Sequence, residues 1–354
     1  MKKQNSCSLS KKTSIGGQAL MEGIMMRGPQ KSAMAVRRPN GSIFFEEEEN
    51  TQKRRPRICR LPVIRGVFAF VDSMVLGYKY LMKSAEIYCE EEEKKSESGE
   101  ESTKESPQSA FGKTTMAIMG VAATVLGVAL ALFLFVWLPT FLYTLLAKHV
   151  SSPTLRESRL LRSSFEGVFK ILILVAYMAL VSLMKDIRRT FMYHGAEHKT
   201  IFCYEQGLPL TVENVRAQRR FHPRCGTSFL ILMLLVSIVA GMFIPTEIGT
   251  LSGALYTVVR AAIKILLIPV IMGVGYELLK LAGKYDNLFT RIISAPGMWL
   301  QRITVREPDD GMIECAIMAF VAVMPEGEKE AYGVAEQSTA QSEESAKDKA
   351  QSEE

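Results

Sequence analysis

The residues most able to carry out chemistry lie between positions 193 and 226. Three of the four histidines of the chain fall there, with a glutamate between them and a cysteine at the end: His194, Glu197, His198, His222 and Cys225. Imidazole, carboxylate and thiolate groups bind zinc and activate water in proteins. Apolar runs precede and follow the stretch, so we expect any chemistry to be held at a membrane surface.

His194 and His198 are four residues apart, and on a helix both imidazoles would share one face. Such a pair can bind one zinc ion at about 2.0–2.1 Å from each nitrogen. With Glu197 they form H-x-x-E-H, the inverted zinc-protease pattern in which the glutamate activates water. That fold also needs a downstream carboxylate ligand. Glu277, the one acid in the later apolar spans, lies on a different predicted helix.

His222 and Cys225 end a basic loop, just before an apolar run that starts at Gly226. The N-terminus of a helix and the adjacent Arg224 both favour a thiolate at Cys225. Together the three histidines and the cysteine would make a closed, structural zinc site. With one position open and Glu197 as the base, the site would be catalytic.

The residues leave other interpretations open. In a site without metal, His194 would pair with Glu197, and His222 would cap the helix that follows. Cys203 is either a spare ligand or a buried packing residue, the commoner role of a free cysteine. His149 borders an apolar run, and we expect no role for it.

The elements that must position these groups are mainly membrane-spanning helices. We expect a bundle over residues 114–284, with spans at about 115–138, 166–185, 226–246 and 258–281. Pro139 marks a break or kink after the first span. The fourth span is the weakest, because it contains four residues that are unusual in a membrane helix: Arg260, Lys264, Pro269 and Glu277. The alternative is that this segment re-enters the membrane or lies buried against the bundle.

The short loops set the predicted orientation. Segments 53–65, 185–224 and 280–306 are rich in lysine and arginine, whereas 247–256 has none. The positive-inside rule then predicts a multi-pass protein of the cytoplasmic membrane, with both termini and loop 186–225 in the cytosol. Loop 148–164 carries four basic residues and conflicts mildly with this orientation.

The remaining segments predict a small α+β cytosolic domain built from both termini. Residues 14–60 are β-rich, with a hairpin turn at Pro39-Asn40-Gly41. An amphipathic helix follows at 61–89, lying on the membrane or on the cytosolic domain. Residues 285–325 form C-terminal helices, with a turn at 294–297 and a helix starting at Pro308-Asp309-Asp310. Residues 1–13, the acidic linker 90–113 and the acidic tail 326–354 are predicted to be disordered.

Charge and cysteine usage suggest the compartment and the partners. Residues 86–105 and 326–354 each carry a net charge of −6, which leaves +18 on the rest of a chain whose total is +6. That basic surface suits anionic lipid or RNA. It includes an arginine cluster, which positive-inside topology also explains: Arg188, Arg189, Arg216, Arg219, Arg220 and Arg224. Nothing predicts specific DNA recognition. Six scattered cysteines fit a reducing compartment.

Several longer motifs resemble the YqhQ-like family of bacterial membrane proteins. They are Gly16-Gly17-Gln18-Ala19, Met21-Glu22-Gly23, Met25-Met26-Arg27-Gly28-Pro29, Tyr193-His194-Gly195-Ala196-Glu197-His198-Lys199, His222-Pro223-Arg224-Cys225-Gly226-Thr227-Ser228-Phe229 and Arg306-Glu307-Pro308-Asp309-Asp310. The resemblance covers roughly residues 14–325. The family is a domain of unknown function that is sometimes labelled a predicted metal-dependent enzyme. The resemblance therefore implies a metal role for the His, Glu and Cys positions.

Three hypotheses follow. In the first, the protein is a membrane hydrolase with zinc held by His194, His198, His222 and Cys225, and Glu197 as base. In the second, it is a non-enzymatic scaffold whose basic cytosolic face docks lipid headgroups, RNA or another membrane complex. The third is transport, since Lys264 and Glu277 are intramembrane charges of the kind that mark ion paths. Four spans without a visible repeat disfavour transport, although a homo-oligomer could form a pore.

Overall fold

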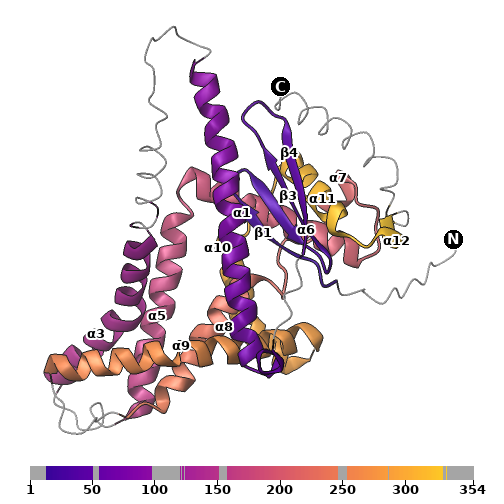
Figure 1. Cartoon of the computed structure of the whole chain (residues 1–354). Helices are drawn as coiled ribbons and strands as arrows, with labels where there is room; N and C mark the ends of the chain where they lie inside the picture. The colour runs from indigo at the N-terminus through magenta and orange to yellow at the C-terminus, as the bar shows by residue number, and fades with distance from the viewer. Residues whose placement is uncertain are drawn as a thin grey trace.

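The computed structural model describes residues 13–50, 56–97, 120, 122, 124–150, 158–245, 253–285, 287–329 and 332. These residues form a mainly helical molecule with one small antiparallel sheet. Figure 1 shows the sheet packed beside α6 and α11, and the helices α3, α5, α8 and α9 grouped on the other side of the long helix α1. The predicted disordered segment 1–13 lies outside the described residues except for Thr13.

The sheet is a meander in chain order, with each strand antiparallel to the next. Its strands are β1 (Gly16–Leu20), β2 (Gly23–Arg27), β3 (Lys31–Arg37) and β4 (Ile43–Glu49). The predicted hairpin joins β3 to β4, with Val36 paired to Phe44 and Gly41 at a φ of +93°. Such a φ favours glycine, so the Asn-Gly pair fixes this turn.

Both ends of the described chain contribute to the core around the sheet. Helix α11 (Asp310–Val323) packs on β2 and β3, and α6 (Lys185–Glu205) packs on β1 and α11. Their shared core buries Met26, Tyr193 and Phe320 completely. The predicted α+β unit made from both termini is therefore present. The start predicted for α11 is also confirmed, because the Asp309 carboxylate caps the helix by accepting from the Met312 amide at 2.9 Å.

Helix α1 (Ile64–Glu97) follows a single 3₁₀ turn, η1 (Arg57–Arg60), and covers the other face of the sheet. Tyr80 of α1 is buried against Met25 and Met34. The amphipathic helix predicted at 61–89 is thus confirmed, but it continues to Glu97, past the start of the predicted disordered linker. Glu and Lys propagate a helix well, which accounts for the extension. The rest of that linker, 98–113, lies outside the described residues.

Three described helices are long and apolar enough to cross a membrane: Thr124–His149, Arg159–Val181 and Leu255–Lys284. The described part of the first helix runs past the end of the predicted span at 115–138, because the helix continues through Pro139 as α3 (Leu138–His149). The π-helical turn η2 (Phe133–Trp137) ends two residues before that proline. A widened turn accommodates the missing N–H and the ring, so Pro139 does not end the helix.

The other apolar helices match the predicted spans in part. Helix α5 (Arg159–Val181) starts before the predicted 166–185, and α9 (Gly253–Lys284) contains Pro269 without a break. Helix α8 (Gly226–Met242) is apolar but has 17 residues. At 1.5 Å per residue it is about 26 Å long, short of a roughly 30 Å hydrocarbon core. The described residues thus hold three helices of spanning length, not four.

The turn predicted at 294–297 is wrong, because Pro296 lies inside α10 (Leu288–Thr304). Helix α10 packs along α8, and this tertiary packing outweighs the local cost of the proline. The predicted disorder of the tail is also wrong at its start. Residues Glu326–Lys329 form the short helix α12, and the Tyr332 hydroxyl donates to the Tyr204 carbonyl at 3.0 Å. The tail beyond position 332 lies outside the described residues.

Candidate metal centre

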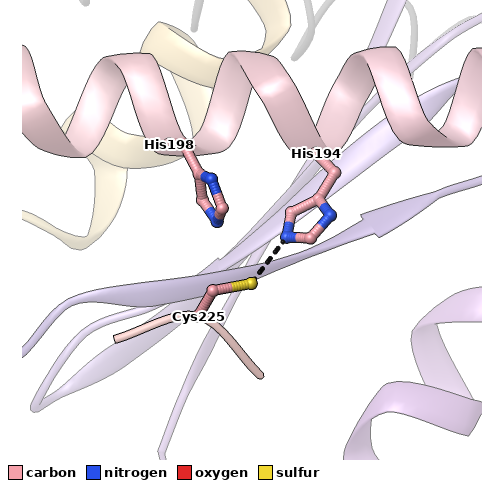
Figure 2. A group of neighbouring side chains, drawn as sticks. All are labelled: His194, His198 and Cys225. Atoms are coloured by element: carbon pink, nitrogen blue, oxygen red, sulfur yellow. Dashed lines mark hydrogen bonds between the residues drawn. The ribbon is translucent and has the colours of Figure 1, made fainter. Parts of the chain in front are cut away.

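Helix α6 presents the two predicted histidine ligands on one face. We predicted that the second span would continue into this region as one helix, but residues 182–184 separate α5 from α6. The prediction of a shared face is nevertheless confirmed, because both histidines lie within α6. The ring centroids of His194 and His198 are 4.4 Å apart, and Figure 2 shows both rings on the same side of the helix.

Cys225 lies opposite these two rings, at the N-cap of α8. Its Sγ is 3.1 Å from His194 Nε2 (Figure 2). The Sγ also accepts the Thr227 amide at 3.4 Å. His194, His198 and Cys225 each offer one ligand atom, and these atoms all lie within 4.8 Å of one another. The group could therefore hold a metal ion. The two elements predicted to converge, α6 and the start of α8, do meet here.

Backbone carbonyls fix the orientation of both imidazoles. His194 Nδ1 lies 3.0 Å from the Thr304 carbonyl oxygen, and His198 Nδ1 lies 2.5 Å from that of Arg220. A carbonyl only accepts, so each Nδ1 carries the proton and each Nε2 keeps its lone pair. His198 is buried, and its Nε2 has no hydrogen-bond partner within the described residues. Burial, and after it the nearby His194, lower the pKa of His198, which favours the neutral, ligating form.

A glycine on α6 allows the Thr304 carbonyl to reach His194. A Cβ at Gly195 would lie 1.9 Å from the carbonyl oxygen of Arg306. The extended segment after α10 therefore runs directly against α6, where the Arg306 amide donates to the Phe191 carbonyl at 2.9 Å. A side chain at position 195 would push this segment, and Thr304 with it, away from the histidine.

Glu197, the predicted base, is buried beside the three-residue group but is not a member of it. Its Oε1 accepts the backbone N–H of Gly17 at 3.0 Å, which ties α6 to β1. Burial raises the pKa of Glu197 above its ordinary value, and the nearby His194 opposes that rise. The carboxylate lines a cavity of about 270 Å³, together with His198 and Cys225. It thus faces the same space as two of the candidate ligands.

His222, the fourth predicted ligand, is buried next to the group but bonds elsewhere. Its ring centroid is 5.6 Å from that of His198. Its Nδ1 accepts the Arg224 amide at 3.3 Å, and its Nε2 lies 3.7 Å from Glu205. The Gln301 side chain also holds both the amide and the carbonyl of His222, at 2.9 and 2.8 Å. The structure therefore places His222 as a neighbour that supports the cavity wall.

Sequence reasoning missed Glu205, which organises the far side of this cavity. The carboxylate accepts the Thr13 amide at 2.9 Å and also bonds the Arg224 guanidinium. Burial opposes its ionisation, but the contacts with His222, Thr13 and Arg224 outweigh burial and lower the pKa of Glu205. The only sequence signal was an acid two helical turns past His198, and many solvent-exposed helices also contain such an acid.

The other predicted candidates have structural contacts. Cys203 is buried with its Sγ 3.4 Å from the Pro209 carbonyl, and burial raises the pKa of its thiol to about 11. It is therefore a packing residue. Of the arginine cluster, Arg189 pairs with Glu22, Arg216 with Asp310, Arg220 with Glu307 and Arg224 with Glu205. These arginines join segments of the domain, and binding of lipid or RNA by them stays a prediction.

Comparison with known proteins assigns the family. The family described as "Protein of unknown function (DUF1385)" matches residues 61–326, which include the whole histidine and cysteine group. The chain belongs to the DUF1385 family. A similar protein, "Uncharacterized protein YqhQ" from Bacillus subtilis (strain 168), is 34% identical over 307 residues, 86% of this chain and 90% of the relative. The predicted YqhQ-like resemblance is confirmed. No solved structure matches the chain.

Proposed function

We propose that this protein is a zinc-dependent hydrolase held at a membrane, with His194 Nε2, His198 Nε2 and Cys225 Sγ as its metal ligands. The observation that carries the proposal is the convergence of these three atoms within 4.8 Å. Two imidazoles come from α6 and one sulfur from the start of α8, so the group depends on tertiary packing. Three protein ligands with one position left open is the arrangement of catalytic zinc sites.

The chemistry of the donors fits zinc. Zinc bonds of about 2.05 Å to nitrogen and 2.3 Å to sulfur place tetrahedral ligand atoms about 3.5 Å apart. The 3.1 Å between His194 Nε2 and Cys225 Sγ is close to that separation. Each histidine donates its other nitrogen to a carbonyl, as metal-ligating histidines usually do. A buried Nε2 without a hydrogen-bond partner at His198 would destabilise a metal-free protein, and a bound metal ion would remove that free-energy cost.

Glu197 is the residue we assign as the general base. Its raised pKa moves its proton affinity toward neutral pH, which suits a group that takes a proton from water and returns it to a leaving group. The Gly17 amide holds one oxygen in place, and the carboxylate lines the cavity. Zinc, when bound, would supply Lewis acidity and a lowered pKa for water in that cavity.

The cavity limits the substrate to a small polar group at the reacting end. Residues 13–17, Arg224 and His222 are among the residues that line it. Arg224 is charged and can contact an anionic or carbonyl oxygen. We therefore infer hydrolysis of a carbonyl or phosphoryl compound whose remaining part extends out of the cavity.

The cellular location is part of the same proposal. Three apolar helices could cross a membrane, and the basic segments 185–224 and 280–306 contain α6 and α10. By the positive-inside rule we assign the sheet, α6 and both termini to the cytosol. This assignment requires an even number of crossings, so it also makes the shorter apolar helix α8 a crossing. The hydrolytic site would then open on the cytosolic side of the membrane.

The test is zinc content and zinc affinity of the purified full-length protein in detergent. We expect one zinc per chain in the wild type, and at least 100-fold weaker binding in His198→Ala and Cys225→Ser. His149→Ala is the matched control, because His149 is exposed and bonds only the Leu145 carbonyl within the described residues. A wild-type protein that binds no zinc at micromolar concentrations would refute the proposal.

Two further variants separate a catalytic from a closed structural site. Glu197→Gln should keep its zinc and lose all turnover in a screen of ester, amide and phosphoester substrates. His222→Ala should keep zinc within about tenfold of the wild-type affinity, as expected for a residue outside the ligand set. A loss of zinc in His222→Ala equal to that in His198→Ala would instead establish the closed four-ligand site.

A further inference from the structure

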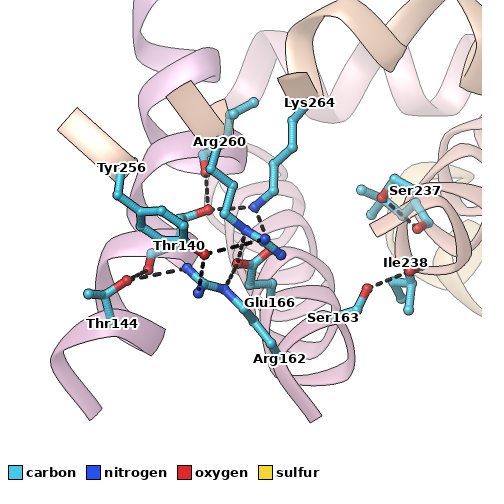
Figure 3. A network of polar contacts seen from close by, with 12 residues as sticks. Thr140, Thr144, Arg162, Ser163, Glu166, Ser237, Ile238, Tyr256, Arg260 and Lys264 are labelled. Atoms are coloured by element: carbon cyan, nitrogen blue, oxygen red, sulfur yellow. Dashed lines mark hydrogen bonds and ion pairs between the residues drawn. The ribbon is translucent and has the colours of Figure 1, made fainter. Parts of the chain in front are cut away.

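A second cluster of charged residues lies within the apolar helices, away from the candidate metal centre. Arg162 and Glu166 are in the first two turns of α5, and Arg260 and Lys264 are in the first half of α9 (Figure 3). All four are buried, and Arg260 has no exposed surface at all. Charged groups inside an apolar bundle are costly and usually mark a functional site.

Glu166 is the common partner of these cations. It accepts Arg162 Nε at 3.2 Å and bonds the Lys264 ammonium, while Arg260 Nε lies 3.9 Å away. Lys264 also donates to Thr140 Oγ1 of α3 at 2.5 Å (Figure 3). The cluster therefore ties α3, α5 and α9 together around one carboxylate.

The positive charges outnumber the negative ones. Lys170 follows Glu166 by one helical turn, so four cations surround the single carboxylate of Glu166. Arg260 donates to the Pro245 carbonyl at 2.6 Å, but its Nε and Nη2 have no hydrogen-bond partner among the described residues. Uncompensated charge in a medium of low dielectric constant is strongly unfavourable. An anion in the bundle would remove this cost.

A cavity beside the cluster has room for such an anion and for an apolar chain. It is partly open, has a volume of about 430 Å³ and lies between η2, α5, α8 and α9. That volume is within the range of small-molecule sites. Lys170, Lys264 and Glu166 are among the lining residues, and Glu166 is the only acid of that set. The rest of the wall is mainly apolar, with Leu174 and Leu267 as examples.

We propose that this cavity binds one anionic membrane lipid, with its phosphate at Lys170 and Lys264 and an acyl chain along the apolar wall. The two lysines supply the charge that phosphate needs. The apolar wall favours an amphiphile over a free anion, because free phosphate would leave that surface unfilled. The site is distinct from the candidate metal centre and shares none of its residues.

The test is native mass spectrometry of the full-length protein in detergent. The probes are dioleoyl phosphatidic acid, dioleoyl phosphatidylcholine, oleate and inorganic phosphate. We expect one phosphatidic acid per chain, bound at least tenfold more tightly than each of the other three. Lys170→Gln should weaken that binding at least tenfold, and Lys170→Arg should retain it. Lys148→Gln removes an exposed lysine of α3 and should bind as the wild type does.

Each other outcome overturns the proposal in a defined way. If phosphatidylcholine bound as tightly as phosphatidic acid, the site would not select for a negatively charged headgroup. Equal binding of inorganic phosphate or oleate would remove the phospholipid assignment. Unchanged binding by Lys170→Gln would place the lipid elsewhere. Because Glu166 keeps its bonds to Arg162 and Lys264 when Lys170 is replaced, this variant is expected to fold, and an unfolding temperature within about 2 °C of the wild type checks that.

Discussion

Gly195→Ala tests how the candidate metal centre is positioned. The new Cβ would start 1.9 Å from the Arg306 carbonyl oxygen, and ordinary contact begins at 3.4 Å, so the segment must move by about 1.5 Å. Overpacking of this kind costs about 1–3 kcal/mol, and a strained or lost hydrogen bond between Arg306 and Phe191 adds about 1 kcal/mol. We therefore expect a loss of about 2–4 kcal/mol, which lowers the unfolding temperature by roughly 5–15 °C.

The same displacement should weaken zinc binding, because the Thr304 carbonyl that orients His194 lies two residues before Arg306. Loss of such an outer partner typically costs 10- to 100-fold in metal affinity. The assays are thermal unfolding of the detergent-solubilised protein and a competitive zinc titration. Gly226→Ala is the matched control, since a Cβ there meets nothing within 4 Å. If Gly195→Ala matched the wild type in both assays, the positioning role of this contact would be refuted.

Three further predictions concern groups around the site and the bundle. Contacts in the fold lower the pKa of Glu205, so its stabilisation is fully present above its unfolded pKa of about 4.3 and is lost as the pH falls through the lower folded value. Glu205→Gln should therefore lower the unfolding temperature at pH 7, and the further decrease of that temperature below pH 4 should be smaller than in the wild type. An unfolding temperature that depends on pH as in the wild type would contradict this. Burial raises the pKa of Cys203 to about 11, so iodoacetamide at pH 8 should label exposed Cys89 at least tenfold faster, as peptide mass spectrometry can check. Glu277 holds Arg65 of α1 at 2.5 and 2.6 Å, and Glu277→Gln should lower the unfolding temperature by a few degrees without changing zinc content.

The local part of the site was predictable from the sequence. The spacing of His194 and His198 requires only a helix, and the polarity change before Gly226 predicts a helix N-terminus at Cys225. What the sequence left open was which side chains converge. His222 and Cys225 are equally plausible ligands by spacing, but Gln301 fixes the backbone of His222, and Glu205 and the Arg224 amide contact its imidazole. Gln301 and Glu205 come from distant segments and leave no local pattern.

In the fold, too, local features were predictable and contacts between distant segments were not. The Asn-Gly turn and the acidic start of α11 depend on local backbone preferences, and both were predictable. The predictions at Pro139 and Pro296 were wrong for different reasons. A π-helical turn keeps Pro139 inside a helix, and tertiary packing keeps Pro296 inside α10. The buried pairing of Glu166 with cations of α9 was also out of reach. Sequence alone marked Lys264 as unusual but could not show which acid compensates it.

The central claim is that two imidazoles and one thiolate hold a zinc ion. X-ray absorption at the zinc edge of the purified full-length protein tests it most directly. We expect two nitrogens and one further light atom at about 2.0–2.1 Å, with one sulfur at about 2.3 Å. The sulfur should disappear in Cys225→Ser. A bound zinc without sulfur, or with more than one, would contradict the account.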